Sequence, residues 1–165
     1  MSAEEDELRD LGRDVLWTEK GHFTMSGIWR TTHLVLGLTA TIGSAVAAAV
    51  VSDAGNTTVA TTAALLAAIA SAVLTFLKPR DVADTYLQAG RRLGELRVKI
   101  RQCERLDLPG GAGSPELRAQ LAEYAAEKAE IDSGAPHVPN FAMALVERRM
   151  KRGAFDETSG KPAGQ

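Results

Sequence analysis

An almost uncharged segment dominates this sequence, because Thr31–Leu77 holds 47 residues and only one charged side chain, Asp53. The uncharged runs Thr31–Ser52 and Ala54–Leu77 both exceed the roughly 20 residues that an α-helix needs to cross a hydrocarbon core. The turn signal DAGN separates the two runs. The pattern therefore predicts a transmembrane helical hairpin over 31–77, with spans at 31–52 and 58–77 and an outer loop at 53–57.

A soluble helical bundle that buries an Ala-rich hairpin is the alternative interpretation of this segment. A domain of 165 residues is large enough to bury helices of such length. A helix of a soluble bundle, however, normally turns charged or polar residues toward solvent. Here that face would hold only Thr, Ser and Ala, so the membrane interpretation is favoured.

Basic residues near the predicted spans indicate how the hairpin is oriented. Lys20 and Arg30 precede the first span, and Lys78 and Arg80 follow the second. The connecting loop has no Lys or Arg, so the positive-inside rule places both termini in the cytoplasm and the loop outside. We expect no cleaved signal peptide, because the start of the chain is acidic and lacks a short apolar core.

The flanking regions are charged and periodic, and they predict an all-α fold of about five helices, with a cytoplasmic helical layer beside the transmembrane hairpin. Residues 1–30 are expected to form a cytoplasmic N-terminal helix and an interfacial segment. Gly21 and Gly27 are expected to weaken the helix between this segment and the first span. Residues 78–152 form the predicted cytoplasmic helical region, and 153–165 a disordered tail.

Two helices are predicted near the end of the cytoplasmic region. A PGGAG loop at 109–113 precedes the first, with Ser114 as its cap and Pro115 in its first turn. The last helix, from about residue 139 to 152, is expected to be anchored by Phe141 and Leu145, with Val146 as a further candidate. Its basic C-terminal end suits the helix dipole, with contact to lipid headgroups as the alternative role.

Each predicted span has a bulky side and a small, partly hydroxylated side when it is projected at about 100° per residue. Small residues let helices approach closely in lipid, which favours helix packing. Hydroxyls can also line a narrow pore, and one hairpin cannot enclose a pore, so this second role requires an oligomer. Both roles stay open for the candidates, which are Gly37, Thr41, Ser44, Ala48 and Ser52 in the first span and Thr61, Ser71 and Thr75 in the second.

Arg30 and His33 extend the first small stripe to the predicted cytoplasmic mouth. His33 is the titratable candidate for a gate or proton sensor at that boundary, because imidazole changes charge near neutral pH. A packed or interfacial histidine is the more ordinary role.

After Pro79 the apolar residues alternate at spacings of four and three, which is heptad spacing over three repeats. Periodicity leaves open whether this seam packs against another chain or against this chain's own terminal helices. We expect a homo-oligomer, with a tetramer as the favoured size, and we expect the single cysteine to be a small core residue. The predicted oligomer seam consists of Val82, Tyr86, Ala89, Leu93, Leu96, Ile100 and Cys103.

Motifs for catalysis and for binding of metals or nucleic acids are missing from the sequence. The three histidines occur singly, so no metal site is expected. No nucleophile-elbow or phosphate-loop motif is present, so we expect neither an enzyme nor a cofactor. The formal net charge of −2 is not that of a nucleic-acid binder, which concentrates basic charge on one surface.

The segment ADTYLQAGRRLGELRVKIRQ at Ala83–Gln102 resembles the SLATT family of bacterial two-span proteins, with Tyr86, Ala89, Leu93 and Leu96 carrying most of the likeness. The likeness implies a protein of the bacterial cytoplasmic membrane that acts as a pore-forming effector in nucleotide-linked defence, without catalytic residues. We therefore expect an oligomeric membrane channel or pore-forming effector of a bacterial defence or stress system. The alternative is a non-conducting membrane scaffold whose cytoplasmic helices recruit a signalling partner.

Overall fold

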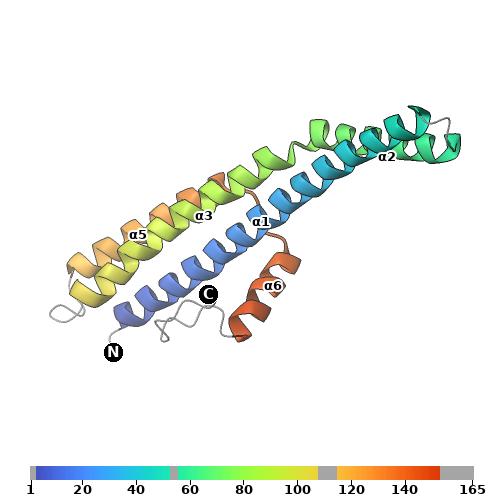
Figure 1. The fold of residues 1–165 in the computed structure, drawn as a ribbon. Coiled ribbons are helices and arrows are strands. Elements are labelled where there is room, and N and C mark those ends of the chain that lie inside the picture. Colours follow the sequence, from blue (N-terminus) through green and yellow to red (C-terminus); the bar gives the residue numbers. More distant parts are fainter. Residues whose placement is uncertain (1–2, 53–55, 108–114, 153–165) are drawn as a thin grey trace. The chain divides into compact units, whose positions relative to one another are not determined.

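The computed structural model describes residues 3–52, 56–107 and 115–152 and is all-α in these ranges, which confirms the predicted fold class (Figure 1). The predicted tail, the PGGAG loop with its Ser114 cap and most of the predicted outer loop lie outside the described residues. The elements are α1 (Ala3–Ser52), α2 (Thr57–Leu77), α3 (Pro79–Gln102), a π-helical turn η1 (Cys103–Asp107), α5 (Pro115–Gly134) and α6 (Asn140–Lys151).

The predicted N-terminal helix and the predicted first span are one helix, α1, so the expected weak point at Gly21 and Gly27 does not interrupt it. A glycine inside a helix costs only about 1 kcal/mol relative to alanine. Gly21 also allows Met143 and Val138 to lie close to α1, because a Cβ at this position would lie 2.9 Å from the Met143 sulfur and 3.1 Å from Val138 Cγ1.

The chain divides into two compact units, and α1 and α3 each contribute to both. The hairpin unit comprises Ser26–Asp84. The bundle unit comprises the described residues of the ranges 1–25 and 85–165, which include α5 and α6. Each unit is described by itself below.

The predicted heptad seam on α3 is the core of the bundle unit. Leu93 and Leu96 are 0% exposed and Ile100 is 1% exposed within a single chain. They pack with Leu8 and Val15 of α1 and with residues of α5, which runs beside α3 (Figure 1). This finding answers the question that periodicity left open: the chain's own helices fill the seam, so these side chains present no surface to a second copy.

The four remaining seam positions differ in how deeply they are buried. Tyr86, Ala89 and Cys103 are buried, whereas Val82 is only half-buried. Cys103 donates a hydrogen bond from its sulfur to Gln120 Oε1 at 3.3 Å. The thiol is therefore a packed core group, as the sequence predicts.

Acidic residues of α1 pair with basic residues on both neighbouring helices of the bundle unit. Glu19 lies 2.7 Å from Arg97 of α3. Asp14 lies 2.9 Å from Lys128, and Glu4 2.7 Å from Arg118, both on α5. Glu19 and Arg97 are largely buried, whereas each pair with α5 has one partner that is more than half exposed, and such exposed pairs contribute about 0–1 kcal/mol each. They orient the helices more than they stabilise them.

The sequence prediction for the side chains that anchor α6 is confirmed for Val146 and wrong for Phe141 and Leu145. Ala142 and Val146 are buried at 0% and 1% exposure, whereas Phe141 is 56% and Leu145 37% exposed. Met143, between these two buried positions on α6, lies against Gly21 of α1. Phe141 and Leu145 are left at the surface.

In the hairpin unit, α2 begins and ends with local caps. The Asn56 side chain accepts a hydrogen bond from the Thr58 N–H at 2.9 Å. At the other end Lys78 adopts a left-handed conformation with φ of 42° and donates its N–H to the Leu74 carbonyl. Pro79 then starts α3, as predicted, because its fixed φ suits a first turn.

Candidate functional site: the exposed faces of the hairpin

The hairpin leaves nearly all of its apolar surface uncovered. Two helices are long and apolar enough to cross a membrane, and their most apolar windows are 0% and 17% buried. Leu34, Ile42 and Leu65 are each more than half exposed, and Phe76 is 86% exposed. The core helices of a soluble protein would be covered by other elements, so the exposure argues against the soluble-bundle alternative.

The two helices of the hairpin meet through a narrow stripe of small residues. Reduced exposure recurs at spacings of four and three, at 36, 40, 43, 47 and 50 on α1 and at 60, 63, 67, 70 and 74 on α2. A Cβ at Gly43 would lie 2.9 Å from the Ala63 carbonyl oxygen and 3.1 Å from Ala67 Cβ. The backbones therefore approach closely at Gly43, as small residues permit.

This stripe is not the one that the sequence analysis selected. Thr41, Ser44 and Ala48 on α1 are exposed, and Gly37 is half-buried with no neighbouring atom within 4 Å of its ideal Cβ. On α2 the exposed candidates are Thr61, Ser71 and Thr75. Ser52 is the last residue of α1, and its side chain lies outside the described residues. Packing by small residues was predicted, but within the hairpin other residues provide it.

The hydroxyls of the exposed stripe donate hydrogen bonds within their own helices. Thr41 donates to the Gly37 carbonyl at 2.9 Å, and Ser44 to the Ala40 carbonyl at 2.8 Å. Thr61 and Thr75 make equivalent bonds four residues back. The hydroxyl donors are satisfied without water, while each oxygen keeps lone pairs that can accept from a neighbour or face an ion.

At one end of the hairpin unit, the two predicted mouth residues lie in one shallow cavity. Arg30 and His33 line it together with Arg80 and Asp84, and its volume is about 260 Å³. Arg30 Nη2 lies 3.5 Å from Asp84 Oδ1, and both side chains are about half exposed. The sequence analysis missed Asp84, although Arg80 and Asp84 are four residues apart on α3 and so share a face.

Comparisons of the chain with models of protein families, with curated proteins and with solved structures find no match. Functional inference therefore depends on the geometry of the two units. Within the described ranges, no group of three or more His, Cys, Asp and Glu side chains is placed to hold a metal ion.

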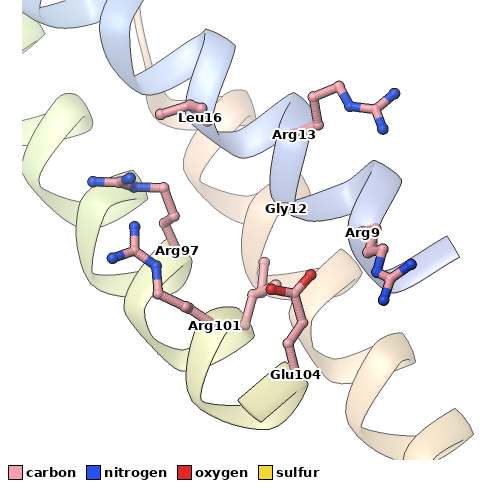
Figure 2. Close-up of a pocket in the computed structure, with 8 residues that line it drawn as sticks. Arg9, Gly12, Arg13, Leu16, Arg97, Arg101 and Glu104 are labelled. Carbon is pink, nitrogen blue, oxygen red and sulfur yellow. The ribbon is translucent and has the colours of Figure 1, made fainter. Parts of the chain in front are cut away.

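A second cavity, of about 380 Å³, lies in the bundle unit between α1 and α3 (Figure 2). Four arginines line it. Arg97 and Arg101 lie side by side on α3, whereas the guanidinium groups of Arg9 and Arg13 extend from α1 in another direction (Figure 2). Arg97 pairs with Glu19 at 2.7 Å and Arg13 with Asp10 at 3.3 Å. The four charges do not converge on one point where a single anion would bind.

His22, which the sequence analysis did not single out, is a titratable group with an almost fully buried side chain. Its side chain is 2% exposed, lines a cavity of about 290 Å³, and lies with its ring centroid 5.7 Å from that of Tyr86. Its Nδ1 has no hydrogen-bond partner among the described residues. Burial lowers the pKa of His22, and the nearby Asp132 carboxylate opposes part of that effect. The imidazole is therefore held neutral near neutral pH.

We expect the bundle unit to lose stability as the pH falls below 6.5, the ordinary pKa of histidine. The unfolded chain then binds a proton at His22 more readily than the folded chain does, so protonation favours unfolding until the pH passes below the lowered pKa. Thermal melts followed by circular dichroism at a series of pH values would measure this loss. The His22→Leu variant should show a weaker dependence on pH in this range, and an equal dependence in both proteins would contradict the assignment to His22.

Proposed function

We propose that the chain is a multi-pass membrane protein of the bacterial cytoplasmic membrane, with both termini cytoplasmic, that assembles into a homo-oligomeric channel or pore. The exposed apolar surface of the hairpin carries this proposal. In water that surface would cost about 25 cal/mol for each Å² left uncovered, and the cost vanishes in lipid. The basic residues beside the spans, and the lack of Lys and Arg in the connecting loop, support the orientation.

The pore is supported by the stripe of hydroxyls that the hairpin contact leaves uncovered. Ser44 lies about 100° around α1 from Gly43, so a face of Thr and Ser remains after the hairpin has formed. Several hairpins that turn this face inward would surround a path lined by oxygen lone pairs. The polar cluster of Arg30, His33 and Asp84 would stand at its cytoplasmic end. The likeness of Ala83–Gln102 to SLATT proteins is the ground for placing such an effector in bacterial defence.

A non-conducting scaffold is the second candidate, and the hydrogen bonds of the hydroxyls favour it. Because Thr41 and Ser44 donate to their own helix, their donors need no water. Such a face can also pack against another helix in a dry interface. In that case the bundle unit would recruit a signalling partner.

Replacing Thr41 or Ser44 by valine distinguishes the two functions. In a pore, the change removes an oxygen from the lining, so we expect a lower single-channel conductance while the oligomer keeps its mass. In a packed interface, the larger side chain of Ser44→Val separates the helices and the oligomer weakens instead, whereas Thr41→Val keeps the shape of threonine and leaves the mass of the oligomer unchanged. Planar-bilayer recording and mass measurement in mild detergent on the same preparations would separate these results.

The matched control is Ile42→Val on the bulky side of the same helix, which should change neither property. Unchanged current in intact Thr41 and Ser44 variants would remove this face from the conduction path and shift the proposal to Thr61, Ser71 and Thr75. A wild-type protein that stays silent across lipids and voltages would favour the scaffold.

A further inference from the structure

The packing of α6 leaves an exposed face that neither proposed function uses. Phe141 is 56% and Leu145 37% exposed, and Arg148 and Arg152 are exposed as well. These residues follow one another at spacings of four, three and four, so they lie on one face of the helix. The face is apolar at its N-terminal end and cationic at its C-terminal end.

The charge of this face is strongly one-sided. Residues 140–152 carry four basic side chains and one acidic side chain, Glu147. Glu147 lies 2.6 Å from Lys151, and this pair lowers the pKa of Glu147 and keeps it ionised. No ion pair of Arg148, Arg149 or Arg152 occurs among the described residues. Three exposed arginines without an ion pair among the described residues therefore follow the exposed Phe141 and Leu145 along the chain.

We propose that α6 docks in the plane of an anionic bilayer surface, with Phe141 and Leu145 entering the headgroup region and Arg148, Arg149 and Arg152 contacting lipid phosphates. A single exposed Phe is ordinary on a protein surface. Two large apolar residues that share a face with several arginines are typical of interfacial helices. Each arginine near an anionic surface contributes about 1 kcal/mol to binding, and salt screens this attraction.

The chain itself would favour this contact if the hairpin spans a bilayer. Only Lys78 separates the end of α2 from the start of α3, so the bundle unit would be tethered to the membrane surface. Tethering replaces a bimolecular step by an intramolecular one with a high effective concentration of lipid. A helix whose affinity for lipid is weak in isolation would then be docked for much of the time. This step rests on the proposed membrane function, whereas the lipid-binding face of α6 does not.

The test uses the full chain in lipid nanodiscs of neutral phosphatidylcholine, with or without anionic phosphatidylglycerol. In a Cys103→Ala background, a cysteine at the exposed Ala144 carries an environment-sensitive fluorophore close to Phe141 and Leu145 without replacing either. We expect blue-shifted emission and quenching by brominated lipid in the anionic discs, and both signals should decrease in neutral discs or at high salt. A fluorophore at the exposed Ala126 of α5 should show neither signal.

Two sets of variants test the two parts of the face. Replacing Arg148, Arg149 and Arg152 together by glutamate should abolish the dependence on lipid charge. The matched control reverses two exposed charges elsewhere in the bundle unit, with Arg91→Glu and Arg105→Glu, and should leave the signals unchanged. Phe141→Ser with Leu145→Ser should reduce the quenching by brominated lipid while some dependence on salt remains.

Three outcomes would overturn the proposal, and one of them also separates it from the membrane function. Equal emission in neutral and anionic discs would refute docking on anionic lipid. A blue shift that persists in lipid-free amphipol and grows with protein concentration would indicate that a second copy covers α6. A fluorophore at Leu65, which is 59% exposed on α2, reports insertion of the hairpin. If Leu65 is quenched and Ala144 is not, only the α6 proposal fails; if Leu65 is not quenched, the membrane proposal fails whatever the signal at Ala144.

Discussion

Replacing Leu93 by glutamate should open the bundle unit and make Cys103 accessible to thiol reagents. Leu93 is 0% exposed and belongs to the same packed cluster as Cys103. A carboxylate placed there costs several kcal/mol, of the order of 2–7 kcal/mol for an unpaired polar group and more if it stays ionised. Small domains are stable by only about 5–15 kcal/mol, so the substitution removes much or all of the folding free energy of this unit.

Cys103 is a suitable reporter because it is the only cysteine in the sequence and is 1% exposed. The milder variant Leu93→Ala should cost about 2–5 kcal/mol. Since about 1.4 kcal/mol corresponds to a factor of ten in an equilibrium constant, labelling that follows transient opening should become roughly 30-fold to several thousandfold faster. Val98→Glu, at a half-exposed position on the same helix, is the matched control and should leave the labelling rate close to that of the wild type.

The same experiment tests in solution that the α3 seam is filled within one chain. If the chain's own helices fill it, Cys103 in the Leu93 variants is exposed at every protein concentration. If the seam joined separate chains, protection of Cys103 would return as concentration rises and the oligomer re-forms. Protection that is unchanged in Leu93→Glu would contradict both arrangements.

Element type and helix periodicity could be predicted from this sequence because long uniform patterns determine them. The uncharged runs predicted both helices of the hairpin, and the heptad spacing predicted that Leu93, Leu96 and Ile100 pack in a seam. What packs against a periodic face is a different question. The spacing of an α3 seam is the same for an intramolecular and an intermolecular partner, and only the positions of α1 and α5 distinguish them.

The contact stripe of the hairpin could not be selected from composition. Gly37, Thr41 and Ser44 offer small residues at helical spacing, and so do Ala40, Gly43 and Ala47. Both stripes allow close approach, so the choice depends on how the two helices meet. For α6 the usual preference for burying the larger apolar side chain selects Phe141. In the structure Ala142 and Val146 are buried instead, and Met143 lies against Gly21.

Replacing Gly43 by valine should separate α1 from α2. Even the first carbon of the new side chain would lie 2.9 Å from a backbone oxygen of α2, at Ala63, and the backbone cannot yield as a flexible side chain would. Overpacking of this kind costs about 1–3 kcal/mol. We expect amide hydrogen exchange in α2 to become about 5- to 150-fold faster in mild detergent, if exchange follows opening of the hairpin and 1.4 kcal/mol equals a factor of ten.

Gly37→Val is the matched control for the hairpin and a test of the face beyond it. Outside the adjoining backbone of α1, no atom of the described chain lies within 4 Å of the ideal Cβ of Gly37, so exchange in α2 should stay at the wild-type rate. Equal effects at the two glycines would mean that valine disturbs α1 itself rather than a contact. If Gly37→Val leaves the hairpin intact but lowers the mass of the assembly, then the exposed small stripe with Thr41 and Ser44 is where copies of the chain meet. If the mass is unchanged, the stripe is open to lipid or to a pore, and the conductance of the Thr41 and Ser44 variants distinguishes these two.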